Sequence, residues 1–149
     1  EHYPEIKALR DVTPEQLVQH QDDMSDVVYR RARHIVTENA RVLQVSRDLY
    51  ENRIAHVGEL LIEGHQSLRH DYEVSIPELD TLVEAAAEVD GCYGARLTGA
   101  GFGGCIIALV DEDAVGDVEA HLVEVYQDKH DMEPTVYVTR ADNGVARMA

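Results

Sequence analysis

The sequence predicts an α+β domain in which helices pack on one face of a small sheet. The first two-thirds of the 149-residue chain carries apolar residues at helical spacing between recognisable helix caps. After Gly91 the pattern changes to short apolar runs flanked by turn residues, which are typical of strands. A strand, helix and strand in series favour a right-handed crossover. Because no repeat or linker divides the chain, we expect a single domain over residues 1–149.

The first two helices are predicted from a cap and from an uninterrupted periodic stretch. Thr13, followed by Pro14, begins a short helix over 14–20. A long helix over 25–50 follows, because this stretch contains neither glycine nor proline. Its inward face is expected at five positions with helical spacing: Val28, Ala32, Ile35, Ala40 and Leu43.

Two more helices are expected before the first strand. One covers about 52–70, where apolar residues and Gly64 step by three and four. The next begins at Ser75 and Glu78, which have the spacing of a capping box, and it ends at Gly91.

Three strands and one helix are expected in the last third of the chain. Strands are predicted over 95–97 and 105–110, where apolar residues follow one another between turns. A helix over about 114–129 has acidic capping residues before it. The β-branched and aromatic run 135–139 predicts a third strand.

The charge balance excludes several classes of partner. Thirteen basic against 29 acidic residues give a net charge of -16, which repels nucleic acid and anionic membrane surfaces. A strongly solvated surface and a salt-adapted source both explain this composition. Cys92 and Cys105 are too few for a disulfide framework, so a reducing cytoplasmic location is expected. The chain opens on Glu1 without an initiator methionine, which suggests trimming or a cut from a longer protein.

The most informative segment is Arg96–Cys105, which has four glycines within six residues. Gly99, Gly101 and Gly104 match the spacing of a dinucleotide fingerprint, but that motif needs a helix after it, and here a strand follows. A protein-kinase loop would lie between strands, yet its lysine and its other motifs are absent. Two interpretations remain: a tight connection between strands, or a loop that lies against a phosphate or another glycine-rich loop.

Other candidate groups carry weaker signals. His65 and His70 are five residues apart and do not share a helix face, so scattered histidines are a better interpretation than a metal site. Ser67 lacks the context of a nucleophilic serine. Four carboxylates could act as bases or bind magnesium, although solvation explains most acids in so acidic a chain: Asp22, Asp23, Asp71 and Glu73.

Four stretches, taken together, resemble one family. Leu97–Cys105 closely resembles the third conserved motif of the GHMP small-molecule kinases, in the form that galactokinases have. Tyr29–Arg41, Gly64–Asp80 and Ala8–Thr13 resemble galactokinase segments in the same order. The resemblance runs from about residue 8 to 140 and implies the fold of the C-terminal domain of these kinases, with a mainly antiparallel sheet and a ferredoxin-like βαβ element.

The resemblance also implies an activity, divided between two domains. It implies an enzyme of galactose metabolism that transfers a phosphoryl group from ATP, with magnesium, to the anomeric hydroxyl of galactose. The family's galactose signature, its phosphate loop and its catalytic aspartate have no counterpart here, so an absent N-terminal domain is expected to hold most of ATP and magnesium. The chain alone is expected to be inactive, with no catalytic residue and no metal ligand of its own. The carried-over nucleotide-site residues are Thr98, Gly99, Ala100, Gly101, Phe102, Gly103 and Gly104.

Two alternatives stay open. The chain could be a non-catalytic binding or regulatory module of the same fold. It could also belong to another sugar kinase of the superfamily, because sugar choice is expected to reside mainly in the N-terminal domain.

Overall fold

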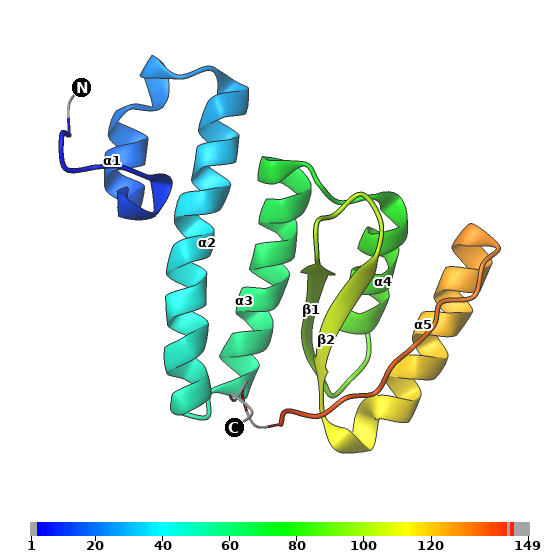
Figure 1. Ribbon diagram of the computed structural model, residues 1–149. Helices are drawn as coiled ribbons and strands as arrows, with labels where there is room; N and C mark the ends of the chain where they lie inside the picture. Colours follow the sequence, from blue (N-terminus) through cyan, green and yellow to red (C-terminus); the bar gives the residue numbers. More distant parts are fainter. Residues whose placement is uncertain (1–2, 143, 145–149) are drawn as a thin grey trace, which may run out of the picture.

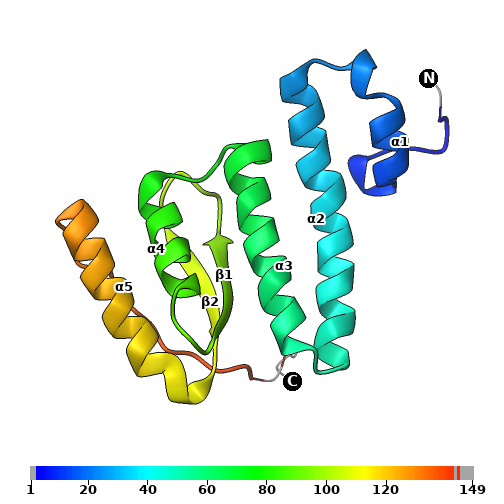
Figure 2. The same cartoon turned by 180° about the vertical axis from the view of Figure 1, so that it is seen from behind.

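The computed structural model describes residues 3–142 and 144. Helices α1 (Pro14–Gln19), α2 (Asp26–Tyr50) and α3 (Ile54–Ser67) stand in a row beside a two-stranded sheet (Figure 1). The sheet and helices α4 (Pro77–Ala87) and α5 (Val115–His130) form the other half of the molecule, as the reverse view also shows (Figure 2). The α+β class is therefore confirmed, and the sheet is antiparallel as expected.

The first two helices begin at the predicted residues. Helix α1 covers Pro14–Gln19, and Thr13 and Gln16 exchange side chain to backbone hydrogen bonds as a capping box. Helix α2 covers Asp26–Tyr50 after a cap at Ser25. Three of their residues form a small core between them: Leu17, Ala32 and Val36.

The predicted inward face of α2 is wrong at most positions. Val28 and Leu43 are 54% and 60% exposed, Ala40 is also exposed, and Ile35 is half-buried, whereas Ala32 is buried as expected. The physical reason is that α1 has only six residues and packs near Ala32 and Val36 in the N-terminal part of α2, while α3 lies on the other side of α2 (Figure 1). Helical spacing identified an apolar stripe, but the neighbouring elements decide which stripe is buried.

Helix α3 covers Ile54–Ser67 and then widens into one π-helical turn, Leu68–Tyr72. Helix α4 covers Pro77–Ala87. The predicted capping box before α4 is not formed, because Ser75 Oγ donates to Asp80 Oδ1 at 2.6 Å instead of capping the backbone.

Strand β1 (Cys92–Thr98) pairs antiparallel with β2 (Cys105–Val110), with Leu97 opposite Ile106. Helix α5 (Val115–His130) follows β2. The main core is formed where α4 and α5 cover one face of the sheet, and its buried members are Val83, Ala85, Ala86, Ala95, Val118 and Leu122. Helix packing on one face of the sheet is thus confirmed.

The predicted third strand over 135–139 is wrong. This segment has no ladder partner, and Tyr137 and Val138 are 80% and 61% exposed. The βαβ element therefore lacks its second strand. β-Branched residues favour extended backbone, but a strand also needs a neighbouring strand to pair with, and within the described residues no strand pairs with this segment.

Helix α3 approaches β1 so closely that side chains would not fit between them. A Cβ atom added at Gly58 would lie 1.9 Å from the carbonyl oxygen of Tyr93, and one at Gly94 would lie 2.1 Å from that of Gly58. The two glycines thus set the distance between helix and strand.

None of the helices within residues 3–142 is both long and apolar enough to cross a membrane.

We predict that Gly58→Ala destabilises the chain although it places a better helix former in a helix. The added methyl group meets backbone that must shift, which costs about 1 to 3 kcal/mol. Gly116→Ala is the matched control, because nothing lies within 4 Å of a Cβ atom there. It should stabilise α5 by about 0.5 to 1 kcal/mol. Urea unfolding of both variants measures the difference, and equal shifts would contradict the close contact.

Candidate functional site

The glycine run forms the connection between β1 and β2. All seven residues carried over by the resemblance lie in it or at its start, and Thr98 is the last residue of β1. Gly103 has φ +131°, a conformation that side chains rarely allow. Phe102 has φ +59°, a strained backbone conformation for a bulky residue, and its side chain is 72% exposed. Strain of this kind is concentrated at functional sites.

The loop backbone is open on the side that faces away from the chain. A Cβ atom added at Gly99, Gly103 or Gly104 would meet no atom within 4 Å. Internal packing therefore does not explain these glycines, whereas their positive φ values of +91°, +131° and +96° do. The open space beside them leaves room for a partner or ligand to approach the backbone.

At Gly101, contact within the chain explains why a glycine is needed. Its added Cβ atom would lie 2.4 Å from the carbonyl oxygen of Val74, and the neighbouring N–H of Phe102 donates to that same oxygen at 2.8 Å. The loop is therefore anchored to the segment between the π-helical turn and α4.

Ser67 lies in a buried polar network that the sequence pattern did not reveal. Its hydroxyl donates to Asp71 Oδ2 at 3.0 Å and accepts a hydrogen bond from His34 Nδ1 at 2.9 Å. Burial lowers the pKa of His34, so this imidazole is neutral at pH 7. Ser67 is 8% exposed, and its two hydrogen bonds join α2, α3 and the π-helical turn.

The two histidines weighed as metal ligands lie in different environments. His65 is fully buried, its Nδ1 accepts a hydrogen bond from the N–H of Leu97 at 3.3 Å, and its Nε2 lies 3.1 Å from Asp80 Oδ1. Burial lowers the pKa of His65, and the ring joins α3 to β1 through its hydrogen bond with Leu97. His70 is exposed. Within residues 3–142 and 144, no three His, Cys, Asp or Glu side chains are grouped to hold a metal ion.

The four carboxylates considered as bases or magnesium ligands lie in two different segments, two in each. Asp22 and Asp23 lie in an exposed 3-10 turn, Gln21–Asp23. Asp71 and Glu73 are each paired with arginines of α2. Charges neutralised by arginine are held in place and are poor bases.

Glu38 of α2 is paired with two arginines and links α2 to the sheet. It accepts from Arg41 Nε at 2.9 Å and from Nη1 of Arg96 on β1. The Arg96 side chain passes over α3 at Gly64, where a Cβ atom would lie 2.7 Å from its Nη1. Burial raises the pKa of Glu38, but the two guanidinium groups outweigh this effect and leave the pKa below its ordinary value.

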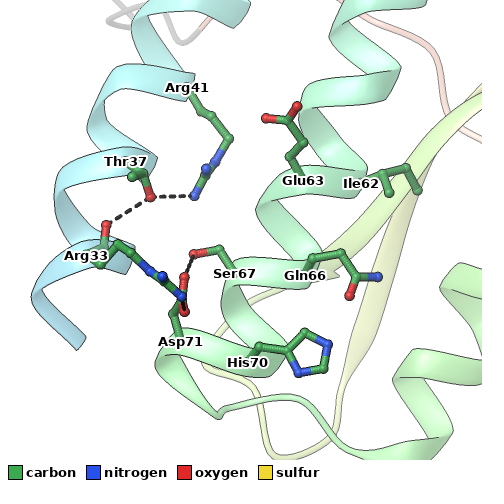
Figure 3. Close-up of a pocket in the computed structure, with 9 residues that line it drawn as sticks. All are labelled: Arg33, Thr37, Arg41, Ile62, Glu63, Gln66, Ser67, His70 and Asp71. Carbon is green, nitrogen blue, oxygen red and sulfur yellow. Dashed lines mark hydrogen bonds and ion pairs between the residues drawn. The ribbon is translucent and has the colours of Figure 1, made fainter. Parts of the chain in front are cut away.

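An open hollow of about 530 Å³ lies between α2, α3 and the π-helical turn (Figure 3). Arg33 reaches Asp71 across it, and Arg41 donates to Thr37 Oγ1 at 3.1 Å. None of the seven loop residues lines it. Its remaining lining residues are Ile62, Glu63, Gln66, Ser67 and His70.

Comparison with known proteins agrees with the sequence motifs. The family model for the C-terminal part of GHMP kinases matches residues 45–128, more than half of the chain. Galactokinase from Roseiflexus sp. (strain RS-1) is 47% identical over 146 residues, which cover 98% of this chain and 37% of that protein. Galactokinase from Staphylococcus carnosus (strain TM300) is 48% identical over 120 residues, 80% of this chain and 31% of that protein.

A solved structure has the same fold. The crystal structure of Lactococcus lactis galactokinase in complex with galactose matches with a TM-score of 0.85 and 38% sequence identity, over 89% of this chain and 34% of that one. The chain thus spans little more than a third of the length of these relatives. The resemblance seen in the sequence is confirmed, whereas the assignment of the seven loop residues to a nucleotide site stays a prediction.

We predict that Glu38→Gln lowers the free energy of unfolding at pH 7 by about 1 to 3 kcal/mol, because two partly buried guanidinium groups lose their charge partner. Since the folded pKa of Glu38 lies below its ordinary value of 4.5, its contribution is present above that pH and is lost as pH falls further. The stability difference between wild type and variant should therefore shrink between pH 5 and pH 3, as urea unfolding at several pH values measures.

The matched control for this variant is Glu112→Gln. Glu112 pairs with Arg140, but both side chains are more than three-quarters exposed. Its substitution should change stability by less than about 0.5 kcal/mol. Equal effects at the two positions would contradict a structural role of Glu38.

Proposed function

The chain belongs to the GHMP kinases, and from this premise we propose that it is the C-terminal domain of a galactokinase. The full enzyme would transfer the γ-phosphoryl group of ATP to galactose and release galactose 1-phosphate. The observation that carries the proposal is the open glycine backbone between β1 and β2, in a chain that resembles galactokinases along almost its whole length.

The loop residues fit the phosphate end of a nucleotide. Successive backbone N–H groups in turns with positive φ form concave sites for anions, and the absence of side chains at Gly99, Gly103 and Gly104 lets phosphate oxygens come close. We infer that Thr98–Gly104 lines the phosphate cleft. ATP would supply the phosphoryl group, while the role of this loop is to bind and orient the phosphates.

Magnesium is not assigned to residues of this chain. The described residues contain no suitable group of ligands, and Asp71 and Glu73 are already paired with arginines of α2. We propose that an N-terminal domain supplies the metal site, the base and most contacts with the sugar. This division fits phosphoryl transfer, which depends on positioning several groups around one phosphate.

Charge supports the same division of labour. A net charge of -16 repels ATP, so the chain by itself is a poor nucleotide trap. The cytoplasmic location expected from the cysteine content remains a prediction.

We predict that the chain alone forms no galactose 1-phosphate from ATP, magnesium and galactose. The reason is that the base and the metal site are assigned to the other domain. A coupled assay for ADP measures turnover, and a cooperative thermal melt of the same sample establishes that the chain is folded. Turnover above a blank without protein would show that a base exists within these residues.

A full-length enzyme that phosphorylates another sugar but not galactose would contradict the assigned substrate.

The glycines of the loop give a second prediction, in the full-length enzyme. Gly103→Ala places a methyl group in open space, so its strain of about 1 to 3 kcal/mol comes from φ alone. If the loop cradles phosphate, the variant should lose kcat/KM for ATP by about tenfold or more per folded molecule. Gly101→Val should instead lower the melting temperature first, because it collides with Val74.

Gly116→Ala, which lies in α5, is the control and should keep wild-type kinetics. A folded Gly103→Ala enzyme with unchanged kcat/KM would leave the glycine run as turn geometry and remove it from the nucleotide site.

A further inference from the structure

Glu73 follows the π-helical turn in a conformation that its own sequence does not favour. Its backbone has φ +57° and ψ +48°, the left-handed region. A residue with a Cβ atom adopts this region at a cost, which glycine or asparagine would reduce. Other interactions must therefore hold Glu73 in place.

Two adjacent arginines of α2 supply these interactions. Arg30 and Arg31 each donate to one carboxylate oxygen of Glu73. The same two side chains also donate to backbone carbonyls of the turn, Arg30 to His70 at 2.8 Å and Arg31 to Asp71. The end of the turn is thus clamped to α2 through both its side chain and its backbone. Arg33 adds an ion pair with the side chain of Asp71.

Val74, the residue after Glu73, is hydrogen-bonded to the glycine loop. Val74 is buried, and its N–H donates to the carbonyl of Leu68 at 3.0 Å, which closes the turn. Its carbonyl oxygen accepts the N–H of Phe102 and lies against Gly101. The connection from α3 to α4 and the loop from β1 to β2 therefore meet at one end of the sheet (Figure 1).

We propose that Glu73 is a positioning residue for the glycine loop. Its carboxylate, held by Arg30 and Arg31, fixes the left-handed turn that points the Val74 carbonyl at Phe102. A contribution of Glu73 to ATP use rests on the proposed function of that loop, whereas its effect on loop position does not.

The direct test is amide hydrogen exchange of Phe102 in the chain itself. Glu73→Asn and Glu73→Gly remove the clamp but tolerate the left-handed backbone, so the chain should still fold. We expect the Phe102 N–H to exchange about tenfold faster in both variants, because its acceptor is no longer held. Amides in the core of α4 and α5 should keep their wild-type rates. Unchanged exchange at Phe102 in either variant would overturn the proposal.

A double-mutant cycle separates the clamp from general damage. Arg30→Gln combined with Arg31→Gln should accelerate Phe102 exchange at least as much as Glu73→Asn does, because it also removes the hydrogen bonds to the backbone carbonyls of His70 and Asp71. Adding Glu73→Asn to this pair should change little more, since the carboxylate has already lost both of its partners. Fully additive effects would overturn the clamp. The matched control is Glu119→Gln on the exposed side of α5, which should leave Phe102 unaffected.

Kinetics of the full-length enzyme then test the link to ATP. Glu73→Asn should raise KM for ATP about tenfold while KM for galactose stays unchanged, because only the phosphate side of the cleft moves. Faster Phe102 exchange with unchanged kinetics would support the clamp and overturn the assignment of the loop to the nucleotide. Unchanged exchange overturns the clamp whatever the kinetics show, so the two failures are distinguishable.

Discussion

The ion pair between Glu38 and Arg96 fixes α2 to the sheet, in addition to the direct packing of α3 against β1. It joins α2 to β1 across α3 at Gly64, where an added Cβ atom would lie 2.7 Å from Nη1 of Arg96. Arg41 adds a second guanidinium to the same carboxylate. All three charged side chains are largely shielded from water, which strengthens their attraction and also makes a lost partner costly. With α2 fixed in this way, its arginines can reach the turn that carries the glycine loop.

Glycines, like ion pairs, determine how the elements of this structure pack together. Gly58 and Gly94 let α3 lie against β1 at backbone distance, and Gly101 lets the loop lie against Val74. Gly99 and Gly103 face open space and have positive φ, so the first three glycines allow close packing while these two allow the left-handed backbone of the loop. One residue type thus has two physical roles, which burial and contact distances distinguish.

The arginines of this chain mainly hold its own elements together. Most arginines among the described residues are already paired with acids, so few basic groups remain to attract a nucleotide: the paired ones are Arg30, Arg31, Arg33, Arg41, Arg53, Arg69, Arg96 and Arg140. What the loop can offer a phosphate is therefore backbone N–H groups, whose dipoles attract anions without adding a charged side chain. Under the proposed function, positive charge would come from an N-terminal domain or from a metal ion.

Local sequence determined the beginnings of α1 and α2, strands β1 and β2 and the place of the glycine loop, because caps, periodicity and glycine clusters act over a few residues. Tertiary structure alone decided which stripe of α2 is buried, that 135–139 stays unpaired, and that Glu38 meets a partner 58 residues away. It also decided that Glu73 is left-handed, since two arginines from α2 offset a cost that the turn itself cannot remove. Local propensities are short-ranged, whereas burial and ion pairing depend on which distant segment the fold brings into contact.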